Sequence, residues 1–151
     1  MKKLLFLAAV VALASCHDPK KDAEKICGLL KEKSEALKSG NDISLAVAQG
    51  QIDAYMDEAK KNYEGDKLKE FEGALKPCQD EAAAAEIAVD AKKACDLYKE
   101  YISALTSNDS TKLAGLETKM EAINQDFEKK YKEGAENTKK FDAEFKKCYQ
   151  Q

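Results

Sequence analysis

The sequence lacks several residue types that particular chemistries require. None of its 151 residues is tryptophan, and all 25 basic residues are lysines, so no guanidinium group is available to clamp a phosphate or carboxylate. His17 is the only histidine, and no two cysteines have Cys-x-x-Cys spacing. These absences argue against a zinc site, a redox dithiol and a histidine-activated serine or cysteine nucleophile. No glycine-rich phosphate loop is present either, so we expect no metal, no cofactor and no enzymatic activity.

Carboxylates are abundant, but their spacing favours a solvated surface over a catalytic pair. Examples are Asp57-Glu58 and the acids between Glu117 and Glu128, which alternate with lysines and apolar residues. Opposite charges three or four residues apart are typical of exposed helix faces. A di-metal carboxylate bundle would also need Glu-x-x-His motifs, which the sequence does not contain.

Long hydrophobic runs are scarce, and the clearest one lies at the start of the chain. Lys2 and Lys3 precede an uncharged apolar run of 11 residues, Leu4 to Ala14. A permanent membrane-spanning helix needs about 20 apolar residues, so this run is too short. A positive start followed by a short apolar core is typical of an export signal.

The end of this signal, Leu13-Ala14-Ser15-Cys16, resembles the lipobox of bacterial lipoproteins at every position. The resemblance implies that the signal peptide 1–15 is removed and that Cys16 becomes the first residue, carrying fatty acyl chains such as palmitate. Because His17 rather than aspartate follows Cys16, resemblance to enterobacterial sorting implies the outer membrane as the address. The resemblance covers only this segment, and the mature part of the chain resembles no family that we recognise.

The charge balance of the mature chain limits its partners. Without Lys2 and Lys3, 23 lysines remain against 28 acids, a net charge of 23 − 28 = −5. Nucleic-acid binding requires a net positive surface, so we expect no nucleic-acid partner. We expect two partners, which are the membrane, contacted through the lipid anchor, and a protein of unknown identity.

The mature chain repeats itself. Residues 22–63 align with residues 90–131 at a constant offset of 68, and 15 of the 42 pairs are identical, including Cys27/Cys95. The offset then becomes 70, and Phe71/Phe141 and Cys78/Cys148 match. Such a pattern predicts a tandem duplication.

Each copy shows three apolar stripes with helical spacing. The composition, rich in alanine, glutamate and lysine, also favours helix. We therefore predict an all-α fold, a duplicated three-helix unit with six helices stapled by disulfides. Pro77 should end or kink the third helix of the first copy. The stripe predicted to face the core at the start of the second copy consists of Cys95, Tyr98, Ile102 and Leu105.

The predicted boundaries follow from the repeat. Residues 16–21 form a lipidated polar tether, 22–80 the first repeat, 81–89 a helical connector rich in alanine, and 90–151 the second repeat. The connector carries no helix breaker after Pro77, so it should run continuously into the first helix of the second repeat as far as Leu105.

Four cysteines lie on the apolar stripes, and four cysteines allow three disulfide connectivities. With a rise of 1.5 Å per residue in an up-down-up bundle, Cys27 and Cys78 come to about the same height, and so do Cys95 and Cys148. We therefore predict the bonds Cys27–Cys78 and Cys95–Cys148, which an exported compartment would permit.

These observations favour a lipid-anchored helical protein of the bacterial cell envelope that acts as a binding or adaptor module. Two alternatives remain open. The protein could be an inhibitor or immunity-type protein that blocks an exported enzyme, or a carrier of a small ligand in a pocket between the two repeats.

Overall fold

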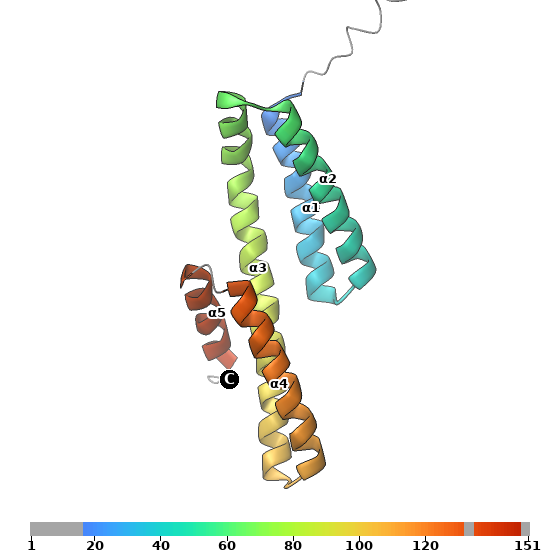
Figure 1. Ribbon diagram of the computed structural model, residues 1–151, viewed down its shortest axis with the longest axis vertical. Coiled ribbons are helices and arrows are strands. Elements are labelled where there is room, and N and C mark those ends of the chain that lie inside the picture. The colour runs from blue at the N-terminus through green and yellow to red at the C-terminus, as the bar shows by residue number, and fades with distance from the viewer. Residues whose placement is uncertain (1–16, 132–134, 149–151) are drawn as a thin grey trace, which may run out of the picture. The chain divides into compact units, whose positions relative to one another are not determined.

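A computed structural model describes residues 17–131 and 135–148, and within them the chain forms helices and connecting turns but no strand (Figure 1). The five helices are α1 Pro19–Ser39, α2 Asp42–Asn62, α3 Gly65–Thr106, α4 Ser110–Tyr131 and α5 Ala135–Lys147. The all-α prediction is therefore confirmed.

The chain divides into two compact units. The first contains the chain up to Lys33 together with Ile43–Gln79, and the second contains Ser34–Asp42 together with the chain from Asp80 onward. Helices α1 and α3 therefore contribute residues to both units, whereas α2 belongs mainly to the first unit and α4 and α5 belong to the second.

The prediction of six helices is wrong for the described residues, because α3 runs through Pro77 without ending. An interior proline typically costs about 3 kcal/mol of helix stability. Packing on both sides offsets this cost: Phe71 and Leu75 are buried before the proline, and Ile87 and Ala91 are buried after it. The third segment of the first repeat and the first segment of the second therefore form one helix, which includes the predicted connector 81–89.

Helix α1 begins earlier than the tether prediction allows. Pro19 occupies the first helical position, where its missing N–H costs nothing. The Asp18 carboxylate accepts hydrogen bonds from the backbone N–H groups of Lys20 and Lys21, at 3.0 and 3.4 Å. Asp18 is thus the N-cap, and residues 19–21 belong to the helix rather than to a tether.

The turns that follow α1 and α3 have the same geometry. Gly40 has a φ of 67°, and the N–H groups of Gly40 and Asn41 bond back to the carbonyls of Leu37 and Ala36. Sixty-eight residues later, Asn108 has a φ of 52° and the same two bonds recur, from Asn108 to Leu105 and from Asp109 to Ala104. Both are Schellman caps, which satisfy the last free carbonyls of a helix.

The first unit has a closed hydrophobic core. Tyr63 and Phe71 are only 2% and 1% exposed, and their ring centroids lie 5.5 Å apart. Around them pack further buried side chains, which are Ala23, Ile26, Ile52, Ala59 and Leu75. Helices α1, α2 and the start of α3 all contribute to this core, so it fixes their mutual packing.

The second unit relies more on aromatic rings that are partly exposed. Phe127 and Phe141 have centroids 4.7 Å apart, Phe141 and Tyr131 5.7 Å, and Phe141 and Phe145 6.1 Å. Only Tyr131 of these four is buried. Helices α4 and α5 therefore meet through rings that remain accessible to solvent.

The predicted core stripe at the end of α3 is partly wrong. Ile102 and Leu105 are 40% and 43% exposed, and Ala104 is buried instead. The predicted stripe and the observed buried positions both have helical spacing. Which of these two faces is buried depends on the element that packs against this part of α3. Here α3 turns the small Ala104 side chain inward.

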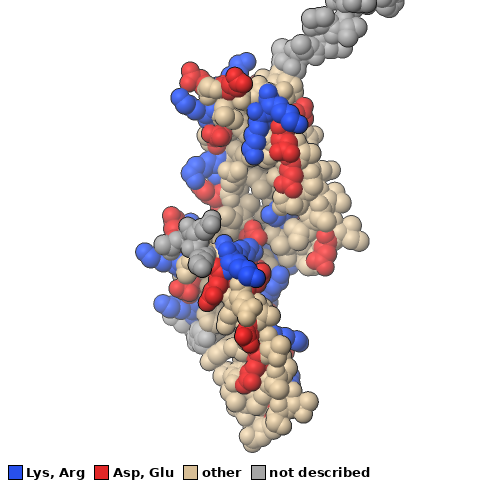
Figure 2. Space-filling view, viewed as in Figure 1, with Lys and Arg blue, Asp and Glu red and all other residues tan. Residues whose placement is uncertain are grey.

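Exposed lysines and acids lie close together on the face that Figure 2 shows. Ion pairs on the helix surfaces include Lys92–Asp96 and Lys140–Glu136. No helix within residues 17–131 or 135–148 is both long enough and apolar enough to cross a bilayer.

Candidate functional site

The predicted site residues fall into two groups. Cys16 lies outside the described residues. The other four cysteines form the bonds Cys27–Cys78 and Cys95–Cys148, with Cα–Cα distances of 5.3 and 6.0 Å, which is the pairing expected from helix heights. Both distances suit a disulfide.

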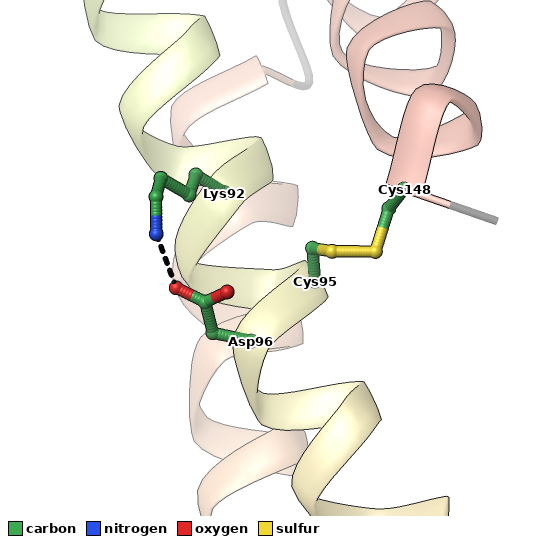
Figure 3. The surroundings of a disulfide bond; sticks show 4 residues. All are labelled: Lys92, Cys95, Asp96 and Cys148. Atoms are coloured by element: carbon green, nitrogen blue, oxygen red, sulfur yellow. Dashed lines mark hydrogen bonds and ion pairs between the residues drawn. A yellow bond between two sulfur atoms is a disulfide. The ribbon is translucent and has the colours of Figure 1, made fainter. Parts of the chain in front are cut away.

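Each disulfide joins a helix near one end of the described chain to α3. Cys27 of α1 is bonded to Cys78 of α3, and Cys95 of α3 is bonded to Cys148, directly after α5. Figure 3 shows the second bond together with the ion pair of Lys92 and Asp96, which come from the same stretch of α3 as Cys95 and whose charged atoms are 2.7 Å apart. The four cysteines therefore have a structural role, because they cross-link the helices of each unit, and none of them is a free thiol.

One tyrosine–aspartate hydrogen bond connects the two ends of the repeated segment in each unit, and it is part-buried in the first unit and buried in the second. The Tyr63 hydroxyl donates to Asp22 Oδ2 at 2.6 Å, and the Tyr131 hydroxyl donates to Asp90 Oδ2 at 2.7 Å. Burial, together with the neighbouring carboxylate, raises the pKa of both tyrosines well above the usual value of 10. Both phenols are therefore protonated donors at neutral pH and are unsuited to act as nucleophiles.

The surroundings of the two carboxylates differ. His17 Nδ1 lies 3.3 Å from Asp22 Oδ2, and Asn62 Nδ2 lies 3.4 Å from His17 Nε2. The hydrogen bond from Tyr63 is the main cause that lowers the pKa of Asp22. The first unit thus ties the residue next to Cys16 into its fold.

In the second unit a lysine, instead of a histidine, binds the aspartate beside the tyrosine. Lys130 Nζ binds Asp90 and also lies 2.7 Å from Glu86 Oε1. Burial lowers the pKa of Lys130, but its bonds to Asp90 and Glu86 outweigh burial and leave that pKa raised. The cluster therefore places one cation between two carboxylates.

A groove of about 590 Å³ lies between α4 and α5. Its aromatic residues are Phe127 and Tyr131 from α4 and Phe141 from α5. Its polar residues are Asn124, Glu128, Thr138 and Asp142. A recess that combines aromatic rings with a few polar groups is typical of a binding site.

Two other hollows lie in the second unit. One of about 460 Å³ is lined by Tyr101 of α3 and, on α4, by three glutamates, Glu117, Glu121 and Glu128. The other, of about 520 Å³, lies between residues 37–40 and residues 85–96 and carries lysines at its rim. Neither combines several aromatic rings with polar groups, so the α4–α5 groove is the stronger candidate.

No metal site is formed by the histidine, cysteine and acidic residues in the described part of the chain. The sequence analysis missed the tyrosine–aspartate bonds, although Asp22/Asp90 and Tyr63/Tyr131 are the first and last identical pairs of the repeat. It also missed the groove, whose polar residues look like part of a solvated helix face in the sequence.

Comparison with known proteins identifies no relative: no family model, no curated protein and no solved structure matches the chain.

Proposed function

We propose that this protein is a lipid-anchored binding module of the bacterial cell envelope, built from two diverged copies of a three-helix unit. The anchor is supported by the order of Lys2-Lys3, the apolar run and the lipobox ending at Cys16. The address expected from His17 is the outer membrane. More than one acyl chain is needed for stable anchoring, which agrees with a lipidated first residue.

The duplication is supported by features that recur at equivalent positions. The disulfides, the Schellman caps at Gly40 and Asn108, and the tyrosine–aspartate bonds each occur once per copy. Five helices instead of six are compatible with this origin, because fusion of two successive helices into α3 removes one helix boundary.

The single observation that carries the binding role is the α4–α5 groove. It is lined by three aromatic side chains within one disulfide-stapled unit, and Phe127 and Phe141 in it are only partly buried. Exposed aromatic residues are enriched where proteins bind partners, because they contribute large contact areas. An adaptor that recognises an envelope protein through this groove is the function that the geometry supports best.

Two measurements test the proposal. Cys16→Ser should abolish incorporation of radiolabelled palmitate and leave the protein unprocessed or released from membranes. A photo-crosslinking residue at position 124, in the groove, should capture a defined envelope protein in living cells. The matched control is the same residue at exposed position 60 in the first unit, which should not.

A mature N-terminus elsewhere than at Cys16, found by mass spectrometry, would contradict the anchor. Equal crosslinking from positions 124 and 60, or none from either, would contradict the groove as the binding surface.

A further inference from the structure

Several residues that line the α4–α5 groove differ in chemical character from their counterparts in the first copy. At the repeat offset of 68, Asn124 corresponds to Met56 and Glu128 to Lys60, and at the offset of 70, Thr138 corresponds to Leu68. In the first unit Met56 and Leu68 pack against the hydrophobic core. In the second unit their polar counterparts line the groove instead.

The aromatic side of the groove is also specific to the second unit. Phe127 takes the position of Ala59, so a phenyl ring lies beside Phe141 where the first copy has only a methyl group. The faces of aromatic rings carry partial negative charge and attract cations. Apolar side chains and organic cations can therefore both contact this surface favourably.

The charge of the groove points the same way. Glu128 and Asp142, which are both acidic, line the groove. Their counterparts in the first copy are one cation, Lys60, and one anion, Glu72. Among residues 17–131 and 135–148 no lysine pairs with Glu128 or Asp142. The nearby Lys130 and Lys140 bind Glu86, Asp90 and Glu136 instead.

From this geometry we propose that the groove binds a peptide segment in which a lysine or arginine stands next to apolar side chains. The apolar side chains lie on Phe127, Tyr131 and Phe141, and the cation reaches Glu128 and Asp142. A volume of about 590 Å³ accommodates a few side chains. The inference rests on the proposed binding function and adds the chemistry of the partner.

The test uses the lipidated full-length protein in a neutral detergent, with 4-fluorophenylalanine in place of phenylalanine. Of the five phenylalanines, Phe6 lies in the signal, so four fluorine signals remain. The probe is the peptide acetyl-Phe-Lys-Phe-amide, and acetyl-Phe-Glu-Phe-amide is the control. The lysine peptide should shift the signals of Phe127 and Phe141 in a saturable way and leave Phe71, the counterpart of Phe141, unchanged.

Matched variants separate charge from shape. Glu128→Gln should weaken binding of the lysine peptide between about twofold and fivefold, as expected for an exposed ion pair. Lys60→Gln in the first unit should have no effect. Asn124→Met combined with Thr138→Leu, which copies the first unit, should fill the groove and abolish the shifts while the other fluorine signals stay dispersed.

Equal binding of the lysine and glutamate peptides, or equal effects of Glu128→Gln and Lys60→Gln, would overturn the proposed ligand chemistry. So would the absence of any shift at Phe127 and Phe141. If position 124 still crosslinks an envelope protein in that case, the binding function stands and only the cationic partner is wrong.

Discussion

The two units use the same tyrosine–aspartate bond and equivalent disulfides, but they differ in how much of their aromatic surface they enclose. In the first unit Phe71 is almost completely buried in a continuous core, whereas its counterpart Phe141 is only partly buried beside a groove. Polar residues at positions 124 and 138 replace apolar ones at 56 and 68. The first unit therefore encloses its aromatic rings in a core, whereas the second unit leaves part of them accessible at its surface.

The largest effect should come from breaking the disulfides one unit at a time. The bonds span 51 and 53 residues, so each contributes about 4 kcal/mol to the free energy of unfolding in the chain-entropy model. Replacing Cys95 and Cys148 by alanine should leave α5 held mainly by contacts among rings that are partly exposed, and its amide hydrogens should exchange rapidly. Replacing Cys27 and Cys78 should lower the melting temperature while leaving α1 protected by its core. Equal protection of α1 and α5 in the two variants would mean that the units do not differ in packing.

Truncation of the equivalent phenylalanines sharpens the comparison. Phe71→Ala should lower the free energy of unfolding by about 3–5 kcal/mol, because it opens a cavity in a closed core. Phe141→Ala should cost only about 1–2 kcal/mol, because the ring is already partly hydrated. Chemical denaturation of both variants measures the difference, and a larger loss for Phe141→Ala would contradict the assignment of the groove as open.

Removal of the tyrosine hydroxyls should have a smaller effect. Tyr131→Phe should cost about 2 kcal/mol, because the Asp90 carboxylate keeps Lys130 but is buried and cannot easily gain water in place of the hydroxyl. Tyr63→Phe should cost about 1 kcal/mol, since Asp22 is more accessible and keeps Lys25 and His17 within reach. Thermal unfolding of the two variants against the wild type tests this order.

The same bonds predict how stability depends on pH. Because the folded state lowers the pKa of Asp22 from 3.8, its contribution to stability is present above about pH 4 and is lost as the pH falls further. Because the folded state raises the pKa of Tyr63 and Tyr131 from 10, their contribution is lost as the pH rises above about 10. In a plot of the free energy of unfolding against pH, Tyr63→Phe should reduce both the loss of stability at acid pH and the loss at alkaline pH. If both losses are unchanged in this variant, the Tyr63–Asp22 bond is not their cause.

The smallest effect concerns the two Schellman caps. Gly40→Ala should cost about 1 kcal/mol, because its φ of 67° is unfavourable for a residue with a Cβ atom. Asn108→Gly should stabilise the second unit by a few tenths of a kcal/mol, because glycine adopts its φ of 52° more readily. The two changes should shift the melting temperature in opposite directions. A shift in the same direction would contradict the equivalence of the two turns.

Much of the fold could be predicted from local features of the sequence. Helical spacing indicates the class, Gly40 and Asn108 mark two helix ends, and helix lengths bring the paired cysteines to matching heights. Long-range packing could not be predicted in the same way. The passage of α3 through Pro77 depends on residues buried on either side of it, and the exposure of Ile102 depends on how α3 meets its neighbour.

The groove was hidden from sequence analysis for a different reason. In the sequence, Asn124 and Glu128 are typical of a solvated helix face, and Phe127 is typical of a hydrophobic core. Only the contact between α4 and α5 brings these residues to one recess. The lipid anchor at Cys16, in contrast, depends on a short linear signal and remains a prediction.

The attachment of both disulfides to α3 has a consequence for proteolysis. A single cut at the turn near Gly40, or at the turn near Asn108, falls within a loop closed by a disulfide, so the two fragments stay covalently joined. Between Cys27 and Cys148, only a cut in residues 79–94 would separate the molecule into two pieces. That stretch is helical throughout and contains no turn, and proteases prefer exposed, irregular segments. A molecule cut at one of these turns would therefore keep the α4–α5 groove covalently joined to the part of the chain that carries Cys16.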